Sequence, residues 1–339
     1  MHARNTLTIL GNLSNYLSIV MEIIRDLSDT RELKNPVATI GNFDGVHIGH
    51  RQIFQKLKKA AKDLDGVSVV ITFFPHPLKV LPSGEKLSLI STYEEKELLL
   101  EASGVDYLVV IPFTEHFAAL SAREFVGEVL VRKIGIKKLI IGYDYAFGRN
   151  REGNIGLLRQ LGKEYGFTVE VLEPIWDGKT IFSSTNIRKM IKSGNVRDVV
   201  ALLGRHFSVG GKGVHGHHRG KMLGFPTANL LTDKELIPKN GVYAVKVKID
   251  QELFDGACNI GPNPTFGDKA NAIEVFIFDF AGDLYERGLQ VYFVERIRDE
   301  RKFPDSAALQ AAIANDVERC REILRDTSII EYHECLGKD

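Results

Sequence analysis

The stretch Val37-Ala-Thr-Ile-Gly-Asn-Phe-Asp-Gly-Val-His-Ile-Gly-His50 decides how the first half of the chain folds. It begins with a short, apolar and partly β-branched run at 37–40, which predicts a buried strand. Three glycines then follow at intervals of four, and they allow another group to approach the backbone closely. From Gly49 onward, apolar residues recur at helical spacing, so the stretch predicts a strand that leads through a glycine-rich loop into a helix.

Two histidines, His47 and His50, lie three residues apart where this helix begins. A helix N-terminus carries free N–H groups and a positive dipole, which suit a phosphate. Imidazoles can donate hydrogen bonds there without adding fixed charge. A bare pair of this kind can also be ordinary surface or core decoration, and half a zinc site would need a third ligand that is not nearby. The strand, the glycines, Asp44 and the helix together favour a phosphate-binding loop.

Composition limits the classes of protein to consider. The chain has 339 residues, which is enough for two ordinary domains, and its 44% hydrophobic and 26% charged residues are typical of a soluble globular protein. The formal net charge of zero argues against a dedicated nucleic-acid binder. Cys258, Cys320 and Cys335 are widely spaced and odd in number, which indicates reduced thiols in a cytoplasmic protein. No apolar run is long enough to span a membrane.

Strand and helix signals alternate from residue 37 to about 173. We expect further strands at 67–73, 106–111, 138–142 and 168–172 and helices at 93–102 and 154–165, with another helix that starts at a capping box of Ser121 and Glu124. This alternation predicts βαβ units and a parallel sheet, whose ligands bind beyond the carboxyl ends of the strands. Both the histidine loop and the loop 142–148, which contains Asp144, follow such ends.

The segment Ser183-Ser-Thr-Asn-Ile-Arg188 closes this half of the chain. Ser184 or Thr185 can cap a helix that runs to about residue 192, and a cap alone is one reading of the segment. The other reading adds Arg188, which lies one turn along and faces the same anion. Hydroxyls, helix N–H groups and a guanidinium together fit a triphosphate or a pyrophosphate.

The pattern changes near residue 206, where glycines and short strands replace the βα rhythm. Strand signals at 241–248, 254–260, 272–280 and 289–293 predict a small antiparallel barrel. A last helix starts at Asp305 or Ser306, and its apolar stripe is expected to pack on the barrel.

A glycine-rich segment, Gly216-His-His-Arg-Gly-Lys-Met-Leu-Gly-Phe-Pro-Thr-Ala-Asn229, precedes these strands. Its glycines predict a loop able to lie along phosphates, although a plain turn before a strand is the simpler interpretation. Thr227 and Asn229 alternate as on a strand, so both oxygens face one way and suit Mg²⁺. The histidines at 215, 217 and 218 favour a solvated loop over a metal site, because no carboxylate or cysteine completes the cluster.

These motifs resemble known signatures. The loop at 41–50 is similar to the His-x-Gly-His signature of the nucleotidyltransferase superfamily, and its longer form looks like the bacterial FAD synthetase branch. The segment at 183–188 resembles that family's Ser-Ser-Thr-x-Ile-Arg, and Leu-Gly-Phe-Pro-Thr-Ala-Asn at 223–229 resembles the riboflavin kinase signature. From about residue 21 to 324 the chain therefore resembles a bacterial bifunctional riboflavin kinase/FAD synthetase (FMN adenylyltransferase).

The resemblance implies an α/β fold of two domains. A parallel-sheet, Rossmann-like nucleotidyltransferase domain is expected at 21–204, followed at 205–339 by a small antiparallel β-barrel with a C-terminal helix. Residues 1–20 match nothing in the family pattern and are expected to be a non-structural extension.

The resemblance also implies two reactions. The second domain would transfer the ATP γ-phosphate to the riboflavin 5′-hydroxyl, and the first would then transfer AMP from a second ATP to FMN, releasing pyrophosphate. ATP and Mg²⁺ are the implied cofactors, and riboflavin, FMN and FAD are the substrates and products. No nucleic-acid or membrane partner is implied.

Roles for single residues follow from the same resemblance. Glu274 would be the catalytic base, although Phe276 stands where the family often has His. His47 and His50 would act on the α-phosphate and Arg188 on the leaving pyrophosphate. Thr227 and Asn229 would hold Mg²⁺. The expected nucleotide and flavin contacts are Gly41, Asn42, Phe43, Asp44, Gly45, Gly49, Asp144, Ser184, Thr185, Gly216, Gly220, Lys221, Gly224, Pro226, Thr227, Asn229 and Arg298.

Two other interpretations stay open at this point. Another nucleotidyltransferase, acting on pantetheine phosphate, nicotinamide mononucleotide or glycerol phosphate, would share His-x-Gly-His but would not explain Pro-Thr-Ala-Asn at 226–229. A non-enzymatic flavin-binding or regulatory protein would be expected to lack catalytic groups, whereas all the groups named above are present.

Overall fold

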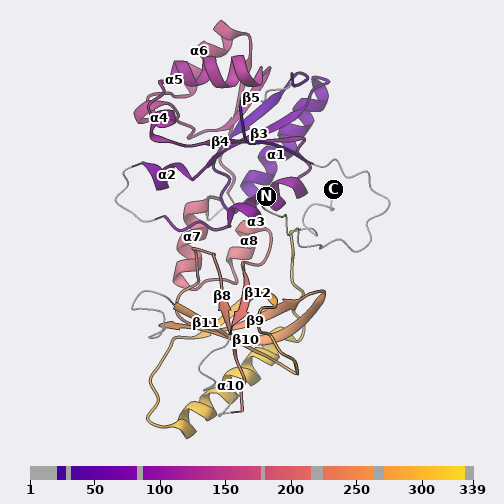
Figure 1. Cartoon of the computed structure of the whole chain (residues 1–339), viewed down its shortest axis with the longest axis vertical. Coiled ribbons are helices and arrows are strands. Elements are labelled where there is room, and N and C mark those ends of the chain that lie inside the picture. Colours follow the sequence, from indigo (N-terminus) through magenta and orange to yellow (C-terminus); the bar gives the residue numbers. More distant parts are fainter. Residues whose placement is uncertain are drawn as a thin grey trace, which may run out of the picture.

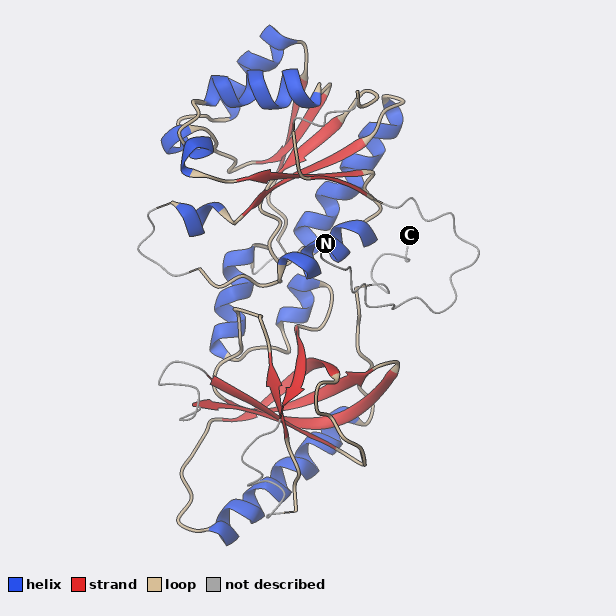
Figure 2. Cartoon of the chain, in the orientation of Figure 1, coloured by secondary structure: helices blue, strands red, loops and turns tan. Residues whose placement is uncertain are grey.

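The computed structural model describes residues 21–27, 32–81, 87–176, 180–214, 224–262 and 271–332. Two groups of strands lie at opposite ends of the chain's long axis, with short helices between them (Figures 1 and 2). The first group is a parallel sheet and the second a closed barrel, so the predicted fold class is confirmed.

The first half is a doubly wound sheet of six parallel strands in the order β1-β4-β3-β2-β5-β6. The strands are β1 (Glu22–Ile24), β2 (Val37–Ile40), β3 (Ser68–Phe74), β4 (Tyr107–Pro112), β5 (Lys138–Gly142) and β6 (Thr168–Leu172). Every residue of β2 is buried, as the apolar run at 37–40 predicts, because helices cover both faces of a parallel sheet.

Two hydrophobic clusters occupy the two faces of this sheet. One contains Phe54 and Leu57 of α1 (Ile48–Asp63) and Leu100 of α3 (Tyr93–Ala102). The other contains Leu130 of the π-helix η1 (Phe125–Ile134) and Leu158 of α6 (Ile155–Tyr165). Shorter helical segments complete this half, namely α2 (Pro77–Val80), α4 (Glu115–Ala118), α5 (Ala122–Glu124) and η2 (Arg149–Arg151).

Local signals in the sequence set several of these boundaries. The capping box of Ser121 and Glu124 is present at the start of α5, as expected. A second capping box, of Thr92 and Glu95, starts α3. The strand β1 was not expected from the sequence. It pairs in parallel with β4 at the edge of the sheet, so the fold already includes residue 22.

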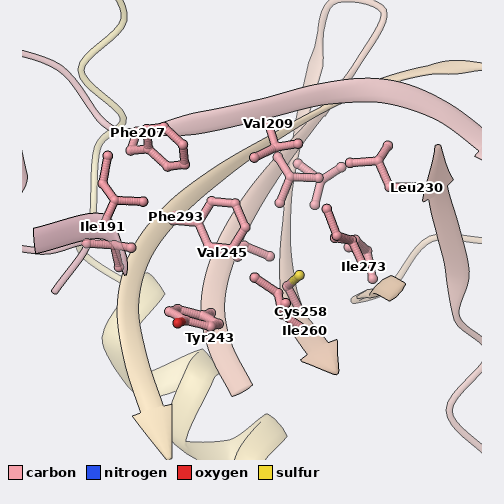
Figure 3. Close-up of a cluster of buried hydrophobic side chains, with 14 of the residues drawn as sticks. Ile191, Phe207, Val209, Leu230, Tyr243, Val245, Cys258, Ile260, Ile273 and Phe293 are labelled. Atoms are coloured by element: carbon pink, nitrogen blue, oxygen red, sulfur yellow. The ribbon is translucent and has the colours of Figure 1, made fainter. Parts of the chain in front are cut away.

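The second half is a closed antiparallel barrel in the order β10-β11-β8-β7-β12-β9. Its strands are β7 (Ser208–Val214), β8 (Ala228–Leu231), β9 (Gly241–Ile249), β10 (Glu252–Pro262), β11 (Asn271–Ile277) and β12 (Gly288–Arg298). Side chains such as Val245, Cys258, Ile260 and Ile273 fill its interior (Figure 3). The helix α10 (Ser306–Leu324), capped by Asp305, packs Val317, Cys320 and Leu324 against the outer wall, as its apolar stripe predicts.

Helices α7 (Ser184–Ser193) and α8 (Val199–Leu203) lie between the two groups of strands (Figure 1). Their apolar side chains belong to the barrel's core cluster, and Ile191 lies close to Phe207 at one end of the barrel (Figure 3). Ion pairs also join the halves, because Lys79 pairs with Glu235 and the buried Lys234 pairs with Glu95. The two halves therefore share one packed interface.

Candidate active sites

A cavity of about 1110 Å³ opens beyond the carboxyl ends of β2 and β5. The strand β2 has β3 on one side and β5 on the other, so the chain order reverses at this point of the sheet. Open parallel sheets bind their ligands at such switch points. The sequence-predicted residues that line the cavity are Gly41, Asn42, Phe43, Asp44, His47, Gly49, His50, Asp144, Ser184, Thr185 and Arg188. Gly45 does not line it.

The two histidines lie together at the start of α1. His47 is the N-cap residue, and its ring stacks on that of His50 with the centroids 3.6 Å apart. Burial, together with the smaller effect of the Arg205 cation, lowers the pKa of His47 to about 4. Burial also lowers the pKa of His50 well below 6.5, with His47 and Arg205 adding to it. Both imidazoles are therefore neutral at pH 7, and among the residues that the structure describes their buried Nδ1 atoms have no hydrogen-bond partner.

The buried carboxylate of Asp44 organises the surrounding backbone. It accepts hydrogen bonds from the N–H groups of Ile90 and Ser91 at 3.0 and 3.2 Å. It also forms an ion pair with Arg188, 2.6 Å from Oδ2 to the guanidinium. The sequence singles out Asp44 only as part of a phosphate loop, whereas the structure shows that it holds Arg188 in place.

The helix α7 presents its N-terminus to the same cavity. Its N-cap is Ser183, whose hydroxyl accepts from the N–H of Asn186, so the expectation that Ser184 or Thr185 caps this helix is wrong. The Ser184 hydroxyl instead donates to the carbonyl oxygen of Asp44 at 2.9 Å. The α7 terminus is therefore joined directly to the histidine loop, a long-range contact that local capping preferences do not reveal.

An aromatic wall forms another side of the cavity and was missed in the sequence. Phe73, Phe113, Phe117, Phe125 and Phe147 all line it, and they form a chain of ring contacts with centroids 5.5 to 5.9 Å apart. Phenylalanines at strand ends and on helices look like ordinary core residues in a sequence. Only the folded chain shows that five of them face one opening.

His76 also lines the cavity and was not singled out in the sequence. It caps α2, where its Nδ1 accepts from the N–H of Leu78 at 3.2 Å, and its own N–H donates to the Tyr93 hydroxyl at 2.8 Å. Burial lowers its pKa to about 4, against the opposing influence of Asp44. The one available signal is the two prolines that flank it in Pro75-His-Pro77, which mark a rigid turn.

A row of polar residues crosses the outer wall of the barrel. In the strand registers, Glu274 of β11 is paired with Asn229 of β8 on one side and with Asn259 of β10 on the other. The alternate residues Ile273 and Val275 point into the buried core, so Glu274 faces outward. Residues paired in this way have their side chains on the same face within contact range. The structure thus brings the expected base next to one of the expected Mg²⁺ ligands.

The other residues expected in this second site are only partly described. Gly216, Gly220 and Lys221 lie outside the described residues, as do the histidines at 215, 217 and 218. Gly224 has φ +84°, a left-handed conformation that favours glycine. Arg298 is expected near the flavin. Its guanidinium donates hydrogen bonds of 2.7 to 3.0 Å to the carboxylate of Asp316 in α10, so it joins the last helix to β12.

Comparison with known families now adds to this geometry. Residues 29–186 match the family model for FAD synthetase, and residues 203–324 match the model for riboflavin kinase. Among curated proteins, the bifunctional riboflavin kinase/FMN adenylyltransferase of Escherichia coli K12 is 36% identical over 89% of this chain and 97% of its own length. The chain belongs to the bifunctional riboflavin kinase/FMN adenylyltransferase family. The resemblance in its motifs is thereby confirmed.

Other curated relatives are also similar to this chain over nearly their whole length. The proteins of this name from Buchnera aphidicola and Pseudomonas fluorescens are 36% and 37% identical and are covered over 96% and 98% of their length. A solved structure described as a macrolide-efflux protein from Streptococcus pneumoniae superposes with a TM-score of 0.80 at 32% identity, over 91% of this chain and 100% of that one. Among the described residues, no helix has the length and apolar character needed to cross a membrane.

Proposed function

We propose that this member of the family is an enzyme that phosphorylates riboflavin to FMN at the barrel and adenylylates FMN to FAD at the cavity of the parallel sheet, using ATP for both steps. The observation that carries the proposal is the meeting of His47, His50 and Arg188 with two helix N-termini in a cavity at the switch point of the sheet. That arrangement fits the phosphates of a nucleotide. The division between the halves is proposed near residue 204.

The chemistry of adenylylation suits this cavity. The nucleophile is the phosphate of FMN, which is already an anion, so the step needs positioning and charge stabilisation and no strong base. Neutral His47 and His50 would donate hydrogen bonds to the α-phosphate as negative charge moves onto it. Arg188, oriented by Asp44, would stabilise the leaving pyrophosphate. The aromatic wall offers ring faces to the isoalloxazine of FMN, and the cavity is large enough to take both substrates.

Phosphorylation of riboflavin suits the polar row on the barrel. The reacting group is a hydroxyl, whose proton must leave as the oxygen attacks the γ-phosphate, so a carboxylate base is appropriate. Glu274 would accept this proton. Asn229, its neighbour in the strand register, would lie beside the transferred phosphate, and Asn259 on the other side would orient the base.

Magnesium is proposed as the metal for both steps. Among the described residues, no group of three or more His, Cys, Asp or Glu side chains could hold a metal ion. Two oxygen donors, Thr227 and Asn229, fit Mg²⁺ better than a transition metal, because Mg²⁺ takes few protein oxygens and keeps waters and nucleotide phosphates as ligands. Thr227 and Asn229 would supply those protein oxygens, and Mg²⁺ would neutralise phosphate charge. A cytoplasmic location is also proposed, since Cys258 and Cys320 are buried free thiols.

One experiment tests the whole proposal. The protein is incubated with riboflavin, ATP and Mg²⁺, and the flavins are separated by chromatography, with FMN supplied in a parallel reaction. Wild-type protein is expected to form FMN and then FAD. Glu274→Gln should form no FMN but should still convert supplied FMN to FAD, because the amide cannot accept the hydroxyl proton. His47→Ala combined with His50→Ala should do the reverse and accumulate FMN.

The outcome against the proposal is equally definite. A wild-type protein that forms neither product would leave the chain a flavin- or nucleotide-binding member of the family. If folded Glu274→Gln protein lost FAD formation as well, two separate sites would be the wrong description. A pantetheine, nicotinamide or glycerol phosphate adenylylated in place of FMN would favour the other nucleotidyltransferase interpretation.

A further inference from the structure

The loop that carries the histidines has an unusual backbone. Phe43, Gly45 and Val46 all have positive φ angles, at 48°, 82° and 37°. Such angles suit Gly45, but a β-branched residue such as Val46 is strained there. Residues in sparsely populated conformations cost free energy and persist only where surrounding contacts hold them. The contacts that hold this loop therefore decide where His47 points.

Some of these contacts come from the parallel-sheet half itself. The N–H of Gly45 donates to the Ser91 hydroxyl at 3.1 Å. The Ser184 hydroxyl donates to the carbonyl of Asp44, whose side chain is fixed by Ile90 and Ser91. These bonds hold Asp44 and the N–H side of Gly45. They leave the carbonyls of Gly45 and Val46, the last two before His47, to be held from elsewhere.

Arg205 supplies the missing contacts from the other direction. Its guanidinium donates to the carbonyl of Gly45 at 2.7 Å and to that of Val46 at 3.2 Å. Arg205 is the third residue of the riboflavin kinase match and lies two residues before Phe207, whose ring is in the barrel core. A planar guanidinium can bridge two carbonyls, and its bonds are charge-assisted. Through Arg205, the barrel half thus holds the strained loop of the parallel-sheet half by two hydrogen bonds.

We propose that Arg205 is a positioning residue for the adenylylation of FMN, holding the strained loop so that His47 and His50 face the reacting phosphate. The inference rests on the proposed function. It assigns a residue at the start of the riboflavin kinase region to the chemistry of the other site. Arg205 acts through the loop backbone and has no assigned contact with substrate.

The charge of Arg205 adds a second effect at the same place. The charged groups that face His47 are Arg205 and Arg188, which disfavour a protonated imidazole, and Asp44, which favours one. Arg205 also disfavours protonation of His50. Removing this cation should raise both imidazole pKa values. The acid side of the pH–rate profile for FAD formation should then move to higher pH, because protonated imidazoles repel each other and lose the arrangement seen here.

The test compares three variants of the full-length protein. Arg205→Met removes both the hydrogen bonds and the charge, whereas Arg205→Lys keeps the charge but lacks the planar fork of donors that reaches the two carbonyls in a fixed geometry. Arg197→Met is the matched control, because this arginine of the same connecting segment pairs with Glu295 of the barrel and does not reach the loop. Rates of FMN-to-FAD conversion are measured across pH with saturating ATP, together with riboflavin phosphorylation and the thermal midpoint.

Arg205→Met is expected to lower kcat for FAD formation by about 10²-fold, the scale of a small misplacement of catalytic groups. The KM for FMN and the rate of riboflavin phosphorylation should change little. Arg205→Lys should recover part of kcat and keep the acid limb of wild type, and Arg197→Met should behave like wild type. An unchanged kcat and pH profile in Arg205→Met would overturn the proposal, as would an equal loss of both activities. Failure of the proposed function differs, because wild-type protein itself would then make no FAD.

Discussion

His76 provides a test of the electrostatics of the cavity through stability alone. Its pKa is lowered from 6.5 to about 4 by burial, with Lys96, Lys79 and Arg188 adding to the effect and Asp44 opposing it. In the unfolded chain the imidazole has its ordinary pKa. As the pH falls through 6.5, the imidazole of the unfolded chain therefore binds a proton, whereas that of the folded protein stays neutral. Folding stability is lost between about pH 6.5 and pH 4.

The size of this effect follows from the two pKa values. At pH 5 the unfolded imidazole is almost fully protonated, whereas the folded one is about nine-tenths neutral. The resulting loss of unfolding free energy between pH 7 and pH 5 is about 2 kcal/mol for His76 alone. His47, whose pKa is also about 4, should contribute a similar amount.

The substitution that isolates the contribution of His76 to the pH dependence of stability is His76→Asn. The asparagine oxygen can still accept the N–H of Leu78, because Asn is a good N-cap residue, but it does not titrate. Urea unfolding followed by circular dichroism at pH 7 and pH 5 should show that wild type loses about 2 kcal/mol more than the variant. His116→Asn, a change of an exposed histidine in α4, should lose as much as wild type. Equal losses in wild type and His76→Asn would refute the reasoning.

Three further outcomes are expected. His50→Ala should slow FAD formation by about 10²-fold or more, which is the scale for losing one transition-state donor, and should change FMN affinity little. Steady-state kinetics with supplied FMN measures both quantities, and a wild-type rate would contradict the phosphate role of the loop. A protein starting at Met21 should keep both activities and the thermal midpoint, because residues 1–20 match nothing in the family pattern, and loss of either would show that they pack on the fold. Ile191→Ala should lower the free energy of unfolding by about 2–5 kcal/mol, because Ile191 is fully buried at the end of the barrel. The same change at the exposed Ile181 should lower it far less. Equal losses at both positions would mean that α7 does not close the barrel core.

Local patterns in the sequence predict the elements well where one strong signal sets them. The run at 37–40 is a buried strand because both faces of a parallel sheet are covered, and the boundaries of α3 and β5 agree with expectation. The three-residue strand β1 escaped notice because so short a segment shows no period. At Ser183 the choice of cap depended on where the chain enters the helix, and three adjacent hydroxyls make that choice ambiguous.

Motifs predict which residues meet in the cavity, but pairing decides what each one does. Asp44 looks like a ligand contact in the sequence, and only the folded chain shows its carboxylate bound to the N–H groups of Ile90 and Ser91 and to Arg188. The neighbours of Glu274 likewise depend on strand register, which is set by distant hydrophobic pairing. Their catalytic roles stay predictions.

The helix α7 has a consequence for how the two activities can be divided between genes. Its Arg188 lines the cavity of the parallel sheet and pairs with Asp44, while Ile187 and Ile191 on the same helix belong to the barrel core. The two family matches end at 186 and begin at 203, yet neither boundary cuts between the physical cores. A split after residue 186 takes Arg188 away from its site, and a split before 203 uncovers the end of the barrel. A protein that carried only one of the two activities would therefore need its own copy of this helix, because each half loses packed or paired residues when α7 stays with the other.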